Sequence, residues 1–201
     1  MPRNEEQNQE LRDARKEQIL QAALLVFARR GMVAAKISDI AKEAGLSHGL
    51  VYHYFTSKEE IFSTLVRRAA NSSVAVIQQA SEQIGTPLEK LHWMSEQILS
   101  GLSDEGNTLL FLIMIQASTS DAIPDEVKEI LTGVEAVSPV TCILPLIIKG
   151  QESGEIILAN PISLAITYYA FVQGLAINKI QWSDCPIPDA KLIMKIFEKE
   201  K

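Results

Sequence analysis

Between residues 47 and 58 the chain carries several polar side chains whose types suit one kind of chemistry. Tyr52 and Tyr54 offer hydroxyl groups, His48 and His53 offer imidazole nitrogens, and Lys58 offers an ammonium group. Hydroxyl and ammonium groups donate hydrogen bonds to phosphate oxygens, and an imidazole can also donate to or accept from a base edge. The cluster therefore favours contact with a nucleic acid.

The same residues do not suggest an enzyme. Three histidines without a cysteine or carboxylate cluster do not make a metal site, and the chain holds three in all. The sequence also lacks a phosphate-binding glycine loop, a GxSxG or HExxH motif and a paired-carboxylate arrangement. We therefore expect no catalytic activity, no metal and no cofactor.

The elements that must position the cluster follow a helix-turn-helix pattern. Apolar residues recur at helical spacing from Ile37 to Ala44. Gly45 can take the left-handed conformation that ends a helix, and Ser47 can cap a second short helix. Two short helices joined in this way form a helix-turn-helix, whose second helix fits the major groove of DNA. An amphipathic helix from Arg15 to Arg30 precedes them.

A third helix of the motif region begins near Lys58. Ser57 and Glu60 form an S-x-x-E capping box, which predicts a long helix reaching to about Gln83. Val51 and Phe55, four residues apart in the second short helix, are expected to face inward.

This region resembles the DNA-binding domain of the TetR family of transcriptional regulators. The segment from Ile19 to Gly31 matches the family pattern I-L-x-A-A-x-x-x-F-x-x-x-G. The segment from Asp39 to Phe62 matches D-I-A-x-x-A-G-h-S-x-G-x-h-Y-x-Y-F-x-x-K-E-x-h-F, in which h is apolar. The resemblance covers about the first third of the chain. It implies a homodimer on a palindromic DNA operator and a small-molecule effector that lowers DNA affinity.

Ten residues are expected to lie at the DNA. They are Lys36, Ser38, Ser47, His48, Gly49, Leu50, Tyr52, His53, Tyr54 and Lys58. The two tyrosines and Lys58 match positions at which the family contacts phosphates. His53 can read a base edge, and Leu50 can either touch a thymine methyl or pack against the first helix. Lys36 and Ser38 stand where the family usually has other residues, but either can bond a phosphate near a helix N-terminus.

The charge distribution is consistent with such a partner although the net charge is −6. Residues 1–68 hold eleven Lys and Arg against nine Asp and Glu, whereas residues 69–201 hold eight against sixteen. DNA affinity depends on where the cations lie. A mildly basic front third can therefore bind DNA while the acidic remainder repels it.

The sequence offers no sign of a membrane or secreted protein. No apolar run approaches the roughly 20 residues needed to span a bilayer, and the first ten residues lack the apolar region of a signal peptide. Cys142 and Cys185 stand far apart, without metal-binding spacing. We expect a cytoplasmic protein with two free thiols and no membrane partner.

We predict an all-α fold in three parts. Residues 1–12 form a flexible arm, 13–60 a three-helix helix-turn-helix DNA-binding domain, and 61–201 a helical ligand-binding and dimerisation domain. Basic residues of the arm, such as Arg3 and Arg12, either reach DNA or belong to a solvated tail.

The helix expected from Pro161 to Trp182 is apolar nearly all round, so that every side of it needs to be covered. One interpretation is that it forms a four-helix bundle across a homodimer together with a last helix from Asp189 to Glu198. The alternative is a central core helix of a monomer.

An effector site in the C-terminal part would be mostly apolar with a few polar groups. The candidate lining residues are Trp93, Glu96, Phe111, Met114, Gln116, Tyr169 and Gln173. Glu96 either meets a cation in a buried site or lies on a solvated face.

These observations favour a ligand-responsive DNA-binding regulator, with a homodimeric repressor as the leading hypothesis. An activator is also compatible with the sequence, which does not decide the sign of regulation. The alternative from another class is an all-helical small-molecule-binding protein or enzyme without DNA function.

Overall fold

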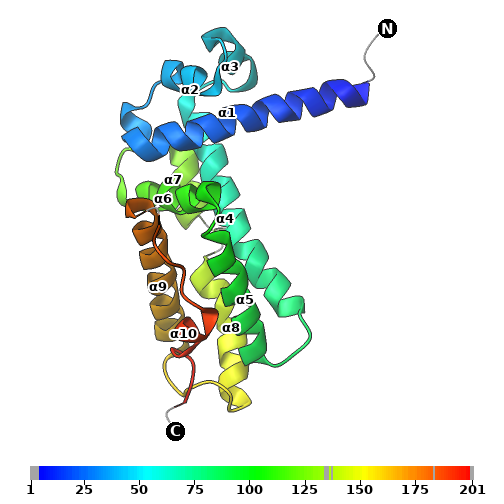
Figure 1. The fold of residues 1–201 in the computed structure, drawn as a ribbon, viewed down its shortest axis with the longest axis vertical. Helices are drawn as coiled ribbons and strands as arrows, with labels where there is room; N and C mark the ends of the chain where they lie inside the picture. Colours follow the sequence, from blue (N-terminus) through cyan, green and yellow to red (C-terminus); the bar gives the residue numbers. More distant parts are fainter. Residues whose placement is uncertain (1–4, 134–135, 137, 183, 200–201) are drawn as a thin grey trace.

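The computed structural model describes residues 5–133, 136, 138–182 and 184–199, and over these residues the fold is all-α, as predicted (Figure 1). The elements are α1 (Glu5–Ala34), α2 (Ile37–Ala44), α3 (His48–Tyr54), α4 (Lys58–Glu82), α5 (Pro87–Gly101), α6 (Glu105–Thr119), α7 (Asp125–Thr132), α8 (Pro139–Glu152), α9 (Pro161–Gln181) and α10 (Ala190–Met194). The first three helices form a head at one end of an elongated molecule, and α4 runs from the head along the remainder.

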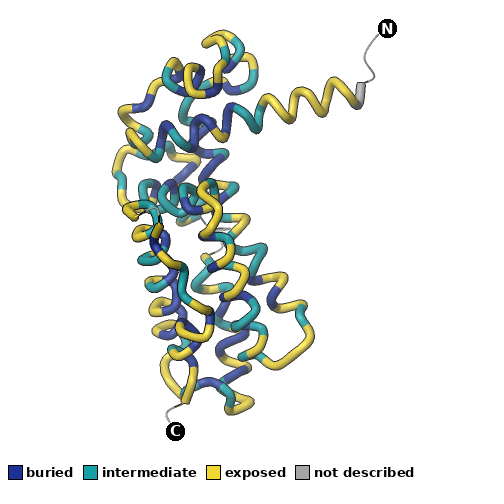
Figure 2. Tube along the Cα trace, in the orientation of Figure 1, coloured by how far each residue is buried: buried dark blue, intermediate teal, exposed yellow. Residues whose placement is uncertain are grey.

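Helix α1 begins earlier than the sequence predicts. Residues 5–12, expected as part of a flexible arm, are helical, and residues 7–15 are exposed as α1 projects from the head (Figure 2). The projecting turns are rich in good helix formers and extend a helix that is already packed further on, so no new nucleation is needed. The Gln9 amide also donates to the Asp13 carboxylate at 3.0 Å. The first four residues of the arm, Arg3 among them, lie outside the described residues.

The predicted starts of α3 and α4 are confirmed by their capping hydrogen bonds, and α5 begins with a cap of the same kind. The hydroxyl of Ser47 accepts a hydrogen bond from Leu50 N at 3.2 Å at the start of α3. Ser57 Oγ accepts from Glu60 N at 3.1 Å at the start of α4. Thr86 and Glu89 form the reciprocal capping box of α5, with bonds of 2.9 and 3.3 Å. Such caps satisfy amides that the first helical turn leaves unpaired.

The head does not have a hydrophobic core of its own. Its core, here called the first core, joins α1 to α4 around Phe27 and Phe62, whose rings meet edge to face at 5.3 Å. Buried Ile113 and Ala117 of α6 and Val127 of α7 belong to the same cluster. The head therefore packs directly onto α6 and α7. A displacement of these two helices would change the packing of the first core.

A second core lies in the C-terminal half of the molecule. It is formed by buried residues of α5, α8, α9 and α10, together with Ile77 and Ala80 near the end of α4. At its centre the hydroxyls of Tyr168 and Ser95 are hydrogen-bonded at 3.0 Å. Helix α4 thus contributes to both cores along its length.

The last helix is shorter than the predicted span Asp189–Glu198. α10 ends at Met194, after which tight turns carry Phe197 into the second core, where it is fully buried. The Phe197 carbonyl accepts a hydrogen bond from Ile157 N at 3.0 Å, which fixes the chain in a non-helical path. Ile193 is also buried within the protomer, so this segment does not present the apolar stripe expected for a bundle with a second chain.

Helix α9 is apolar on two sides, as its sequence indicates. Ala165, Tyr168, Val172 and Ala176 face the second core and are buried.

In the part of the chain that the structure describes, no single helix has both the length and the apolar composition of a membrane span. Helices α5 and α6 meet these criteria only when they are taken together, and they are bent by 100° relative to each other.

Candidate nucleic-acid interface

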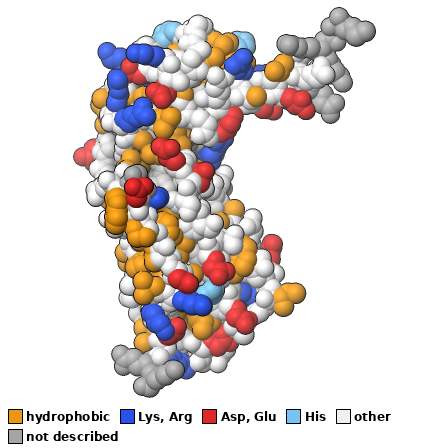
Figure 3. All heavy atoms as spheres, in the orientation of Figure 1, with side chains coloured by type: hydrophobic (Ala, Val, Ile, Leu, Met, Phe, Trp, Pro, Cys, Tyr) orange, Lys and Arg blue, Asp and Glu red, His pale blue; other side chains and the backbone are white. Residues whose placement is uncertain are grey.

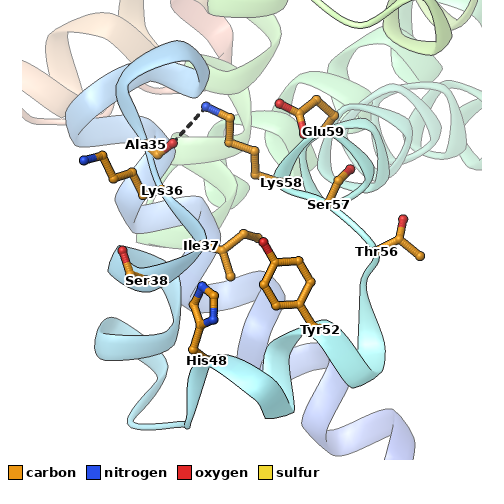
Figure 4. A pocket seen from close by; sticks show the side chains of 10 residues that line it. All are labelled: Ala35, Lys36, Ile37, Ser38, His48, Tyr52, Thr56, Ser57, Lys58 and Glu59. Atoms are coloured by element: carbon orange, nitrogen blue, oxygen red, sulfur yellow. Dashed lines mark hydrogen bonds between the residues drawn. The ribbon is translucent and has the colours of Figure 1, made fainter.

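A hollow of about 450 Å³ lies on the outer side of the head, between the start of α2, helix α3 and the start of α4 (Figure 4). We call it the α2–α4 hollow. It is lined by Ala35, Lys36, Ile37, Ser38, His48, Tyr52, Thr56, Ser57, Lys58 and Glu59. Two helices begin beside it, and the amides and dipole of a helix N-terminus attract anions. The hollow can therefore receive a phosphate group.

Helix α3 has an inward and an outward side, as predicted. Val51 and Phe55 are buried in the first core. The outward side carries most of the residues expected at DNA: Ser47, His48, Gly49, Tyr52 and His53 are exposed, and Leu50 and Tyr54 are half-buried. Around Gly49 the space that a Cβ would occupy is open, so another molecule can approach the backbone closely there.

The aromatic side chains of α3 support each other in pairs. The rings of His48 and Tyr52 meet edge to face at 4.9 Å and rise toward the start of α2 in Figure 4. The rings of His53 and Tyr54 meet in the same way at 5.2 Å. Tyr54 also packs against the first core. These contacts restrict the side chains before any partner is bound.

The start of α2 is held by an acidic residue within the helix rather than by a side-chain cap on the residue before it. The Asp39 carboxylate accepts from Lys36 N at 3.2 Å and pairs with Arg30 of α1 at 3.0 Å. Since Asp39 caps the helix, the Lys36 side chain is not required for capping. Lys36 and Ser38 are both exposed at the hollow.

A phosphate contact would require the ammonium group of Lys58 to point to solvent. In the structure it points to the protein backbone instead. Its Nζ donates to three main-chain carbonyls, those of Met32 at 3.0 Å, Val33 at 2.9 Å and Ala35 at 2.9 Å. Figure 4 shows the last of these bonds. The three carbonyls belong to the end of α1 and the connection to α2, more than twenty residues earlier in the chain.

Three polar residues of the hollow were not among the residues expected at DNA. Thr56 and Ser57 lie at the start of α4, and Glu59 lies in its first turn. The hydroxyl and amide of Thr56 donate to the Glu60 carboxylate at 2.7 and 2.6 Å. The predicted Ser57–Glu60 capping box gave the signal for this, because it places the residues before Lys58 beside the α4 N-terminus. Only its Ser57 half forms, since the Glu60 carboxylate accepts from Thr56 instead of Ser57.

Cationic side chains gather on the head in the face shown in Figure 3, with histidines at its tip. Some cations of the head are paired on the surface, as Arg29 is with Glu43 at 3.5 Å.

Among the described residues, no group of three or more His, Cys, Asp and Glu side chains is placed to hold a metal ion. The arrangement can bind a phosphate backbone and present α3 to a groove.

Comparison with known proteins agrees with this geometry. Residues 19–65 match the model of the family described as "Bacterial regulatory proteins, tetR family". This segment is a DNA-binding domain of the tetR family. The matched segment holds α2 and α3 and all ten residues expected at DNA.

Several relatives in this family are named regulators of transcription or metabolism. The chain is 27% identical over 139 residues to the Fatty acid metabolism regulator protein of Bacillus subtilis, covering 69% of each chain. It is 37% identical over 78 residues to the HTH-type transcriptional repressor KstR2 of Mycolicibacterium smegmatis, covering 39% of this chain and 38% of the relative. The chain thus matches well under half of the length of KstR2.

The likeness in fold extends over nearly the whole chain. A solved structure of a tetR-family regulatory protein from Rhodococcus RHA1 superposes with a TM-score of 0.72, at 17% identity, over 93% of this chain and 98% of the other. The all-helical fold of this chain is therefore shared beyond the matched segment.

The seven residues expected at an effector site do not converge on one place. Trp93, Phe111 and Tyr169 belong to or border the second core, whereas Met114 borders the first. Gln116 lines a groove of about 280 Å³ between the end of α1, α4 and the end of α6.

Two of the seven are surface residues, and for Glu96 this is the solvated alternative that the sequence left open. Glu96 is exposed on α5, where its carboxylate lies 3.5 Å from the imidazole of His92. Gln173 is exposed on the outer side of α9. Both fall on the side of their helix that faces away from the core, which helical spacing alone did not resolve.

Two tyrosine hydroxyls are buried in the second core, where an effector site would lie. Burial raises the pKa of Tyr168 to about 12, and its hydroxyl is paired with Ser95. Burial also raises the pKa of Tyr169, with the neighbouring Tyr168 and Cys142 adding to the shift. The Tyr169 hydroxyl is buried without a hydrogen-bond partner among the described residues. An unsatisfied hydroxyl of this kind is costly unless a ligand or water pairs with it.

Proposed function

We propose that this tetR-family chain is a homodimeric repressor that binds a two-fold operator through α3 and is released by a small-molecule effector. The observation that carries the proposal is the joint arrangement of α3 and the α2–α4 hollow. It combines an outward recognition surface with two helix starts that attract a phosphate. Relatives named as repressors, such as KstR2, support the sign of regulation.

In the proposed complex α3 enters the major groove. Lys36 and Ser38 bind phosphates at the start of α2, and the hydroxyl of Tyr52 does so from α3. His53, exposed on the outer side, reads a base edge. Residues 13–60 then act as the DNA-binding part and residues 61–201 as the effector and dimerisation part, although the first core crosses this boundary.

The proposed dimer forms through the outer faces of α8 and α9. Ile162 and Ile166 of α9 are 52% and 54% exposed, Ile177 follows further along, and Ile148 of α8 is 42% exposed. These two helices pack side by side. Their exposed apolar side chains make burial against a second copy favourable, and two helices from each chain would form a four-helix bundle.

Release by an effector is proposed to act through α4. A dimer must hold its two recognition helices about 34–36 Å apart to enter successive major grooves. Because α4 contributes to both cores, a ligand in the second core can change the angle of the head. A ligand that binds better to a conformer with the wrong spacing then draws the population away from DNA.

The proposed effector site lies where Trp93, Phe111 and Tyr169 border the second core. Its lining is largely apolar, and the unpaired Tyr169 hydroxyl offers one polar contact. The name of the Bacillus subtilis relative, a fatty acid metabolism regulator protein, makes fatty acids the first compounds to test.

The proposal is tested by gel shift on the DNA flanking the gene, with salt titration. Wild type should bind one site, with affinity falling steeply as salt rises. Replacing Lys36 by Met should weaken binding to all sequences and reduce the salt slope by about one. Lys191→Met, exposed on α10 and outside the proposed dimer face, is the matched control and should leave binding unchanged.

The outcomes separate the competing functions. A folded wild-type protein that binds no duplex at low salt contradicts the proposal and favours a small-molecule-binding protein without DNA function. Effector release is tested by adding fatty acids, and any compound that mass spectrometry finds in the purified protein, to the complex. Loss of the shift supports a released repressor, and a strengthened shift contradicts it.

A further inference from the structure

The ammonium group of Lys58 is saturated by the protein itself. An ammonium group has three hydrogens to donate, and Nζ lies 2.9 to 3.0 Å from the carbonyls of Met32, Val33 and Ala35. Two of these bonds are at least partly buried. A phosphate contact from the same group would require it to give up at least one of them.

The accepting segment is one that lacks other donors. At Gly31 the backbone turns to φ 72°, which interrupts the regular α1 helix. Carbonyls at the end of a helix have no donors within it, and a positive charge is favourable there. Lys58 of α4 supplies the missing donors to the connection between α1 and α2, here called the 31–36 connection.

The same connection is fixed from its other side by α2. Asp39 accepts from Lys36 N at 3.2 Å and pairs with Arg30 at 3.0 Å. Lys58 and Asp39 therefore hold the two sides of the 31–36 connection, one from α4 and one from α2. This joins the starts of α2 and α4, which are two walls of the α2–α4 hollow.

We propose that Lys58 is a positioning residue for DNA binding, which sets the first turn of α2 against the first turn of α4 through three carbonyls, and is not itself a phosphate contact. The inference rests on the DNA-binding function proposed above. It leaves the phosphate contacts of the hollow to Lys36, Ser38, Tyr52 and the helix amides. Lys58 also links α4 to the connection that leads into the first turn of α2.

The geometry demands lysine rather than positive charge alone. The three hydrogens of an ammonium group can converge on carbonyls of one turn, whereas the donors of a guanidinium lie in a plane and diverge. Lys58→Arg keeps the charge and should lose the three-carbonyl contact. Lys58→Met loses both and keeps the length of the side chain. Comparing the two variants separates positioning from charge.

The test has one readout without DNA and one with it. Without DNA, hydrogen exchange is measured at the amides of Ala35 and Lys36, which are hydrogen-bonded in the structure. Both Lys58 variants should exchange faster there than wild type. With DNA, and below the melting temperature of each variant, both should weaken binding about tenfold. Their salt slopes should equal that of wild type, whereas Lys36→Met lowers the slope by about one.

Each contrary result overturns the proposal. If Lys58→Met lowers the salt slope by about one while Lys58→Arg keeps wild-type affinity, Lys58 contacts a phosphate. If exchange at Ala35 and Lys36 is unchanged in both variants, Lys58 does not hold the connection. The exchange measurement needs no DNA, so a failure of wild type to bind any duplex would be recognised as a failure of the proposed function instead.

Discussion

Glu17 of α1 and Arg68 of α4 are joined by two hydrogen bonds, of 2.8 and 2.6 Å, between one carboxylate and one guanidinium. The next residue back, Arg67, bonds Glu126 of α7 at 2.7 Å. Two adjacent arginines of α4 therefore tie it to the head on one side and to the C-terminal half on the other. The Arg68 guanidinium lowers the pKa of Glu17.

Replacing Glu17 by Gln should weaken this tie in a pH-dependent way. The side chains are 45% and 37% exposed, so we expect a loss of only about 0.5–1 kcal/mol at pH 7. Because the folded-state pKa lies below the ordinary value of 4.5, the stabilisation is present above pH 4.5 and is lost as the pH falls through the folded-state pKa. Urea unfolding of both proteins at pH 7 and at acidic pH measures this. A difference that stays constant would show that the ion pair is not its source.

The parts of the fold that depend on neighbouring residues could be predicted from the sequence. The caps at Ser47, Ser57 and Thr86 involve partners three residues away, and the inward placement of Val51 and Phe55 follows from one helical turn. Spacing within a helix determines such features.

Features that depend on distant segments could not be predicted. The carbonyl partners of Lys58 lie 23 to 26 residues away, in the segment that follows the break of α1 at Gly31. Helix α9 is apolar nearly all round, so its sequence does not reveal which side packs against its own chain. The sequence thus suggested the whole helix from Pro161 to Trp182 for the dimer interface, whereas the side of it that carries Ala176 is buried within the protomer.

Replacing Ile166 by Glu should convert the proposed dimer into a folded monomer. Ile166 is exposed on the outer side of α9, so a charge there leaves the second core intact and opposes burial against a second chain. Ile84→Glu is the control, since Ile84 is fully exposed after α4 and far along the chain from α8 and α9. Sedimentation at micromolar concentration distinguishes the two masses. A wild type that is already monomeric, or a variant that remains dimeric, rules out this interface.

Replacing His53 by Ala should relax base preference at one position in each half-site. The outer side of α3 offers no Arg–guanine or Asn–adenine pair of the kind worth about 1–3 kcal/mol, so the change in specific affinity should be modest. Nonspecific affinity should stay nearly constant, because the phosphate contacts are unchanged. Selection from random DNA, with His92→Ala on α5 as the control, measures the preference. If His53→Ala recovers the wild-type site with the same preferences, His53 does not read sequence.

The adjacent residues Tyr168 and Tyr169 should respond in opposite ways to loss of the hydroxyl. Tyr168 is bonded to Ser95 at 3.0 Å, and Ser95 donates to the Leu91 carbonyl at 2.8 Å, so Tyr168 is the donor to Ser95. Tyr168→Phe should therefore cost about 1 kcal/mol, or about 2–4 °C in melting temperature.

The Tyr169 hydroxyl is buried without a partner among the described residues, so Tyr169→Phe should leave the ligand-free protein equally stable or stabilise it, because an unpaired polar group is removed from the core. Thermal unfolding of protein stripped of bound compounds, followed by the same measurement with an effector added, tests both variants. In the proposed site the effector should raise the melting temperature of Tyr169→Phe less than that of wild type, since the variant lacks the polar contact. A ligand-free Tyr169→Phe that is destabilised as much as Tyr168→Phe would mean that the Tyr169 hydroxyl is already paired, and the proposed effector contact would have to be abandoned.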